Sequence, residues 1–256
     1  MTITGERVST AEGGFNPTWQ RHVAAYALCA PLLPAGRVLD LGCGVGHSYE
    51  RLAPRETVGV DVDPAVLAGQ ARETQAADMR RLPFAGGSFA SVLAVQSIEH
   101  VPDPERVLAE VVRVLEPGGT AVIVTPNRLT FARPDEIIDP YHHVEYDPAE
   151  LRALCQPCFA AVEMHGLFGS PRYLELVAEE HRRLDRLLNL DPLRARQAMP
   201  RRLRQRLYDR LLTRARRPAS DPRQAAIAVE DFHLGSEELD RALDLVAVGR
   251  TRSVAA

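Results

Sequence analysis

The sequence predicts an α/β fold in which helices cover both faces of a doubly wound parallel sheet. Short apolar runs, such as ETVGVDV at 56–62 and TAVIVTPN at 120–127, alternate with amphipathic stretches of helix length. Strands that are apolar on both faces and separated by helices are typical of a parallel sheet buried on both sides. A glycine-rich turn, VLDLGCGVG at 38–46, directly follows the first apolar run. These observations together favour the doubly wound class.

The elements of the first half follow in order from an apolar helical pattern at 19–33, WQRHVAAYALCAPLL, which Pro34 closes. Further strands are predicted at 36–42, 56–62, 74–79, 88–98 and 120–127, with helices at 47–53, 64–73 and 104–115. The helix from Pro104 to Leu115 is the most clearly defined of these elements. One of its faces carries only Val and Leu, Asp103 can cap its start, and PGG follows its end.

The second half begins with a loop of roughly twenty residues at 128–147, and loops of this length are usually functional. A helix at 147–155 and a strand at 159–168 follow, and then a basic helical stretch up to 217 that Pro192 and Pro200 interrupt. A linker leads to a helix and a strand between 225 and 250. We therefore divide the chain into an N-terminal helical lid (1–35), a ligand-binding core (36–170), an Arg-rich helical insertion (171–224) and a return to the core sheet (225–256).

Composition indicates a globular protein of 256 residues with 45% hydrophobic content, enough for one sizeable core. No run of about 18 apolar residues occurs, and the first residues resemble no export signal, so we expect a cytoplasmic location. Cys155 and Cys158 form a lone C-x-x-C without a second pair of comparable ligands. No metal site is expected from them, and small apolar residues near a helix end are the alternative reading.

Charge is distributed unevenly, because the net charge of -3 conceals a basic segment at 181–217. This segment holds 13 Arg against 3 Asp, and the chain has no Lys. The segment could cap a pocket, bind an acidic or phosphorylated substrate, form a homodimer, touch an anionic membrane surface or present a solvated face. Nucleic acid is not expected, because aromatic residues for base stacking do not interleave with the arginines.

The glycine turn predicts a nucleotide site, because glycines let the backbone approach a ligand and a helix N-terminus offers free N–H groups. A dinucleotide fingerprint would place a third glycine at position 47, but that residue is His47. The spacing therefore argues against NAD. Asp61, at the end of the second strand, suits a ribose diol. Asp78 and Met79, at the tip of the third strand, suit an adenine, so three successive strand tips carry the parts for one adenosine.

The ordered series VLDLGCGVG, VGVDVD, AADMRRLPFAGGSFASVLAVQSIEHVPDPERVLAEVVRVLEPGG and TAVIVTPN resembles the class I S-adenosylmethionine-dependent methyltransferases over residues 36–127. The resemblance implies a mostly parallel sheet of seven strands that binds S-adenosyl-L-methionine across its strand tips. It implies a donor site made of Asp40, Gly42, Cys43, Gly44, Gly46, Asp61, Val62, Asp78, Met79 and Gln96. Asp40 could instead only cap the turn, Asp61 could be a loop acid, and Met79 could be core.

The long loop carries the candidate acceptor chemistry, because a hydroxyl nucleophile needs a group that takes its proton. In DPYHHVEYD, the triplet Pro140–His142 resembles a bacterial subgroup that methylates hydroxyls of sugars or of cell-envelope and secondary-metabolite compounds. That resemblance implies His142 as the base, with Glu145 or Asp147 to orient it. The doubled histidine makes His143 a second candidate, and His100 is a third. Alternatively, His142 only satisfies backbone carbonyls of the loop.

The N-terminal segment NPTWQRHVAAY is expected to fold over the donor, with Trp19, Arg21 and His22 closing the site, or to be a plain docking helix. The main functional hypothesis is O-methylation of a small hydroxylated substrate, which could be a sugar or an anionic molecule. N- or C-methylation of a metabolite would make the histidine loop a binding element. A non-catalytic donor-binding adaptor would use the basic segment to contact a partner or a membrane.

Overall fold

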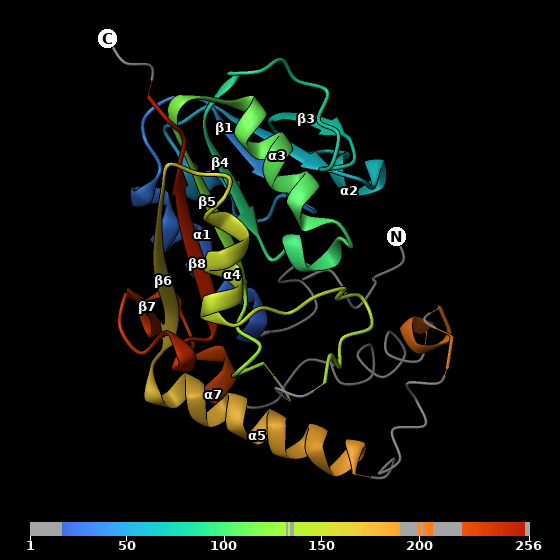
Figure 1. The fold of residues 1–256 in the computed structure, drawn as a ribbon. Helices are drawn as coiled ribbons and strands as arrows, with labels where there is room; N and C mark the ends of the chain where they lie inside the picture. The colour runs from blue at the N-terminus through green and yellow to red at the C-terminus, as the bar shows by residue number, and fades with distance from the viewer. Residues whose placement is uncertain are drawn as a thin grey trace.

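The computed structural model describes residues 17–131, 133, 136–189, 199–200, 202–206 and 222–253. These residues form one sheet with helices packed on both of its faces (Figure 1). The predicted α/β class is therefore confirmed.

The sheet has eight strands within the described residues, in the order β3-β2-β1-β4-β5-β8-β6-β7. Their bounds are β1 Val38–Leu41, β2 Thr57–Asp61, β3 Glu73–Ala76, β4 Phe89–Val95, β5 Leu115–Pro126, β6 Ala161–Gly169, β7 Phe232–Gly235 and β8 Asp244–Arg250. The strands from β3 to β5 are parallel to one another, and β8, β6 and β7 join by antiparallel pairing. All residues of β1 and β4 are buried, which explains their continuous apolar runs.

The expectation of seven strands is wrong, because β7 adds an eighth at the edge of the sheet. This strand has only four residues, pairs antiparallel with β6, and follows a 3-10 turn at Val229–Asp231. Asp231 holds the preceding turn in place by accepting hydrogen bonds from Ser170 and from the Ala228 backbone N–H. A strand of four residues is too short to show a clear alternation of apolar and polar residues. The sequence therefore predicted that the chain returns to the sheet in this region, but not this additional strand.

Each face of the sheet has its own helices, α3 (Pro104–Val114) and α4 (Pro148–Cys155) on one side and α1 (Pro17–Cys29) on the other (Figure 1). The apolar face of α3 packs into the first core cluster through Val107, Leu108 and Val111. Ala24 and Ala25 of α1 pack into the second cluster, which also takes the first turns of α5 (Pro171–Leu188). Helices α1, α3 and α4 lie where the sequence analysis expected them, and α2 is reduced to Pro64–Leu67 because Gly69 adopts a left-handed conformation. The helix expected at 47–53 is only a 3-10 turn, Tyr49–Leu52, and the helix expected after residue 225 is replaced by 3-10 turns at Val229–Asp231 and Leu239–Arg241.

The ends of α3 and α4 show how local chemistry sets helix limits. Asp147 caps α4 by accepting from the Glu150 N–H at 2.9 Å, while the Glu150 carboxylate accepts from the Asp147 N–H. Asp103 precedes α3 but makes no capping bond, and its carboxylate instead accepts from Arg80 at 3.1 Å. The PGG expected to follow α3 lies within β5, where Gly118 takes a positive φ of 78°.

The predicted Arg-rich insertion begins with α5, and most of residues 190–221 lie outside the described part of the chain. On α5 the arginines alternate with acids, and the helix is tied to the rest of the molecule by Arg133–Asp185 and Arg223–Glu179 ion pairs. No described helix is both long enough and apolar enough to span a bilayer.

Candidate active site

The glycine turn after β1 leaves the backbone open toward a cavity. Gly42, Gly44 and Gly46 all have positive φ, at 76°, 52° and 70°, which accounts for glycine at each position. Their surroundings differ. A side chain on Gly42 would meet Ser97 at 2.4 Å and one on Gly46 would meet Gln70 at 2.3 Å, but nothing lies within 4 Å of the corresponding position on Gly44. Gly44 therefore presents bare backbone to open space.

Asp61 at the end of β2 connects that turn to the next strand tip. Its carboxylate accepts from the Gly44 N–H at 3.0 Å and from the Asp63 N–H at 2.9 Å. Each carboxylate oxygen has a second lone pair, so the group can still accept hydrogen bonds from a diol. Asp63, two residues on, caps α2 by accepting from the Ala65 N–H at 2.9 Å.

The tip of β3 contributes Asp78 and Met79, as predicted, but the Asp78 carboxylate already has a partner. Arg80 donates to it at 2.7 Å, and the hydrogen bond from Arg80 lowers the pKa of Asp78. Val62 lies beside this tip with 71% of its surface exposed, an unusually large fraction for an apolar side chain. Together these residues form a wall with an apolar surface and a polar rim.

Asp40, expected in the donor site, is fully buried and does not line the cavity. Its carboxylate accepts from the Tyr26 hydroxyl at 2.7 Å and lies 2.8 Å from the guanidinium of Arg72, which stacks on Tyr49. Burial raises the pKa of Asp40, while Arg72 and Tyr26 oppose that rise. In this structure Asp40 therefore joins β1 to α1 and to the segment before β3.

Gln96 at the tip of β4 has a left-handed backbone, with φ of 51°, and its amide donates to Asp244 of β8. Arg21 of α1 binds the same buried Asp244, with its Nε 2.6 Å from Oδ2. One carboxylate thus ties the first helix, the fourth strand tip and the last strand together. The hydrogen bonds to Asp244, as well as the end of β4, therefore fix the position of Gln96.

A cavity of about 270 Å³ lies over the carboxyl ends of β1, β2 and β4. It brings together most of the predicted donor residues, namely His22, Gly42, Cys43, Gly44, Asp61, Val62, Asp78, Met79 and Gln96, and it also takes in His100. Asp40, Gly46, Trp19, His142 and His143 do not line it. Trp19 instead packs on His47, with ring centroids 4.1 Å apart.

His142 comes from the long loop and is held from both sides. Its Nδ1 lies 2.8 Å from Oε1 of Glu145, whose side chain is almost fully buried. Its ring packs edge-on against His100, with centroids 5.1 Å apart, and near Phe131 at 5.4 Å. Burial lowers the pKa of His142, but the hydrogen bond that it donates to Glu145 and the charges of Glu99 and Asp139 raise the pKa above its ordinary value. His143 is exposed, and its backbone N–H donates to the Glu99 carbonyl at 2.7 Å.

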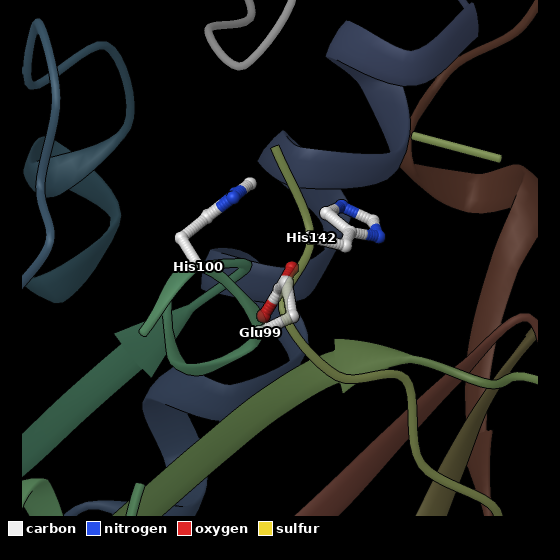
Figure 2. Close-up of side chains that lie close together, drawn as sticks. All are labelled: Glu99, His100 and His142. Carbon is white, nitrogen blue, oxygen red and sulfur yellow. The ribbon is translucent and has the colours of Figure 1, made fainter. Parts of the chain in front are cut away.

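Glu99 was not among the residues predicted from the sequence. It is completely buried in the 3-10 turn Ile98–His100, where Oε2 accepts from Thr125 at 3.0 Å and burial raises the pKa of the carboxyl. Figure 2 shows its carboxylate lying between the side chains of His100 and His142. The adjacent Glu-His pair in IEHV was the available signal, and only its histidine was considered.

Sequence reasoning also missed Arg80 at the cavity and the partners Tyr26, Arg72 and Asp244. Asp147, one of two acids considered for orienting His142, caps α4 and pairs with Arg128 instead. Cys155 and Cys158 are free, and burial raises the pKa of Cys155 to about 12.

A bare glycine turn, an acid at the second strand tip and an apolar wall at the third define a nucleotide-type binding site in an open α/β sheet. The model of a methyltransferase domain matches residues 39–123. A probable S-adenosylmethionine-dependent methyltransferase of Mycobacterium tuberculosis is 35% identical over 187 residues, which cover 70% of this chain and 68% of that protein. One from Mycolicibacterium smegmatis is 32% identical, with 70% and 73% covered.

Among solved structures, a methyltransferase of Thermotoga maritima described as a possible histamine N-methyltransferase has a TM-score of 0.60 at 16% identity, with 90% of this chain and 89% of that chain covered. That likeness concerns the fold alone. With the sequence matches, it makes the chain a member of the class I S-adenosylmethionine-dependent methyltransferases. It is a methyltransferase, and its methyl donor is S-adenosyl-L-methionine.

Proposed function

We propose that this enzyme methylates an oxygen of a small hydroxylated acceptor, with glycosides as the first class to test, and that His142 is the general base. The observation that carries the proposal is the His142–Glu145 pair beside the donor cavity. A buried carboxylate on Nδ1 fixes the imidazole tautomer and leaves the Nε2 lone pair to accept a proton. It also stabilises the imidazolium that proton transfer creates.

On the donor side, we propose that the cavity residues hold S-adenosylmethionine along the strand tips. Gly44 offers open backbone to the methionine part, Asp61 offers two acceptors to the ribose, and Val62 offers an exposed apolar surface that an adenine ring would cover. Asp78 and Met79 complete the adenine wall. His22 lines the same cavity from α1, which supports a lid role for the first helix.

When bound, the donor supplies a methyl group activated by a sulfonium sulfur. The chain's own contribution is to align the acceptor and to exclude water, and well-oriented reactants gain on the order of 7–11 kcal/mol from such positioning. His100 lies between cavity and loop, since it lines the first and packs on His142 of the second. We infer that the acceptor hydroxyl enters at this junction, where His142 takes its proton.

The test compares His142→Ala with wild type in transfer of a labelled methyl group to a panel of hydroxylated, amine and carbon acceptors. General base catalysis typically contributes 10²–10⁴-fold, so we expect turnover on the hydroxyl acceptor to fall by about that factor. Affinity for S-adenosylhomocysteine should stay within about twofold, because His142 does not line the donor cavity. His233→Ala, which removes an exposed histidine of β7, is the matched control.

Wild-type turnover by His142→Ala would remove this residue as the base. Transfer to amines or carbon acceptors alone would replace O-methylation by N- or C-methylation. If the folded protein binds the donor but methylates no acceptor in the panel, a non-catalytic adaptor becomes the better hypothesis.

A further inference from the structure

We propose that Glu99, His100 and His142 form a binding site for a divalent transition-metal cation of the Zn²⁺ type. One ligand atom from each residue lies within 4.8 Å of the other two. The three side chains come from two separate segments, the turn after β4 and the long loop, and they lie close together (Figure 2). Two imidazoles with one carboxylate suit first-row transition metals, whereas Mg²⁺ and Ca²⁺ prefer oxygen ligands alone.

The spacing of the three ligand atoms can be compared with that of a loaded site. Ligand atoms with bonds of about 2.0–2.2 Å to a tetrahedral ion lie about 3.3–3.6 Å from one another. The 4.8 Å limit of the observed cluster exceeds that separation by about 1.2–1.5 Å, so the side chains must move together by about this much when the ion binds.

Both imidazoles already have a hydrogen-bond partner at Nδ1. Nδ1 of His142 is 2.8 Å from Glu145, and Nδ1 of His100 is 3.4 Å from the Tyr141 carbonyl. Hydrogen bonding at Nδ1 leaves Nε2 of each ring as the free ligand atom. The carboxylate–histidine pair is the usual outer support of a metal-bound imidazole.

Glu99 supplies the independent observation that points to a cation. Its Oε1 atom is buried and has no hydrogen-bond partner in the described part of the chain, although Oε2 is bound by Thr125. Oε2 of Glu145 is also buried, and among the described residues it has no hydrogen-bond partner. Two buried carboxylates beside two imidazoles are costly to keep charged without compensation, and a divalent ion would provide it.

The inference rests on these contacts and not on the proposed function, although it concerns the same loop. A metal-bound Nε2 of His142 cannot accept a proton, so base catalysis and cation binding exclude each other at this atom. Three protein ligands also leave an open coordination position, as in catalytic zinc sites, and His100 borders the donor cavity.

The test is titration of the chelator-treated full-length protein with Zn²⁺ by calorimetry and with Co²⁺ by visible absorption, which reports nitrogen and oxygen ligands directly. We expect one equivalent to bind with micromolar or tighter affinity. His142→Ala and Glu99→Gln should each weaken binding at least about tenfold, as should the outer-shell change Glu145→Gln. His233→Ala, which removes an exposed histidine outside the cluster, should leave it unchanged.

S-adenosylhomocysteine binding by the same preparations shows whether each variant is folded. Absence of one-equivalent binding by donor-competent wild type would overturn the metal site and leave the proposed O-methylation standing. Equal affinity in wild type and in folded Glu99→Gln and His142→Ala would also overturn it, because the ions would then lie elsewhere. One-equivalent binding that Glu99→Gln and His142→Ala both weaken would support the site and would exclude Nε2 of His142 as the base in the metal-bound protein. Absence of methyl transfer to any hydroxyl acceptor by the metal-free protein would instead count against the proposed function alone.

Discussion

Replacement of Asp61 by Asn isolates the contribution of one carboxylate to donor binding. The side chain keeps its size, and its remaining oxygen can still accept from the Gly44 N–H, which is 3.0 Å from the carboxylate. The second oxygen, which in the wild type accepts from the Asp63 N–H at 2.9 Å, becomes an NH₂ group that cannot accept this bond. The variant thus loses the negative charge and one acceptor while the glycine turn keeps a tether.

The magnitude follows from the bond that is lost. A hydrogen bond to a charged group contributes about 1.5–3 kcal/mol, and each 1.4 kcal/mol is a tenfold change in affinity. We therefore expect S-adenosylhomocysteine to bind Asp61→Asn about 10- to 150-fold more weakly than wild type. Asp63→Asn should remain within about twofold, because Asn caps a helix as well as Asp does and Asp63 binds its own Ala65 N–H.

The assay is calorimetric titration of both variants with S-adenosylhomocysteine, after circular dichroism and thermal unfolding have shown that they are folded. The comparison with Asp63→Asn removes any general effect of charge at this strand tip. Equal affinities for Asp61→Asn and wild type would refute the assignment of Asp61 to the ribose. Equal losses in the two variants would show that only net charge matters here.

Two further predictions concern stability. Gly42→Ala should lower the free energy of unfolding by about 1–2 kcal/mol through backbone strain and by about 1–3 kcal/mol more through overpacking against Ser97, whereas Gly44→Ala should lower it through the strain alone. Urea unfolding of both variants measures these changes, and equal losses of stability would contradict the prediction. The hydrogen bond from Arg172 lowers the pKa of Asp231 to about 2. The contribution of the Asp231 carboxylate to folding stability is therefore complete above the unfolded pKa of about 3.9 and is lost as the pH falls toward 2. Asp231→Asn should therefore be less stable than wild type at neutral pH and should lose less stability between about pH 4 and pH 2. If the melting temperatures of both proteins fall equally over this pH range, Asp231 does not have this role.

The donor side of the fold could be predicted from the sequence because the motifs that indicate it are short and continuous in the chain. A glycine turn, an acid at a strand end and an Asp-Met pair each follow directly on an apolar run, and parallel strands bring such tips to one edge. Nine of the predicted donor residues line the cavity as a result. The exceptions are instructive, because Gly46 packs on Gln70 and Asp40 is engaged by Arg72, and no local pattern reveals either partner.

The acceptor side was harder to predict because its members come from distant segments. Periodicity does not predict a 3-10 turn of three residues, so the only signal for the buried Glu99 was its position next to His100. His142 could be placed near a pocket by its loop, but its support by Glu145 depended on the loop's path. The ion pair between Arg21 and Asp244 spans 223 positions along the chain, a separation at which sequence alone gives no information.

That ion pair has a consequence for how the enzyme is made. Residues 244–250 form β8, which lies between β5 and β6, and its first residue holds both Arg21 and Gln96. While a ribosome is still synthesising the chain, the glycine turn, the strands β1 to β5 and the hydrogen bond from Tyr26 of the first helix to Asp40 can already form, but the bonds of Arg21 and Gln96 to Asp244 cannot. The α1 side of the donor site is therefore completed only after β8 has emerged from the ribosome.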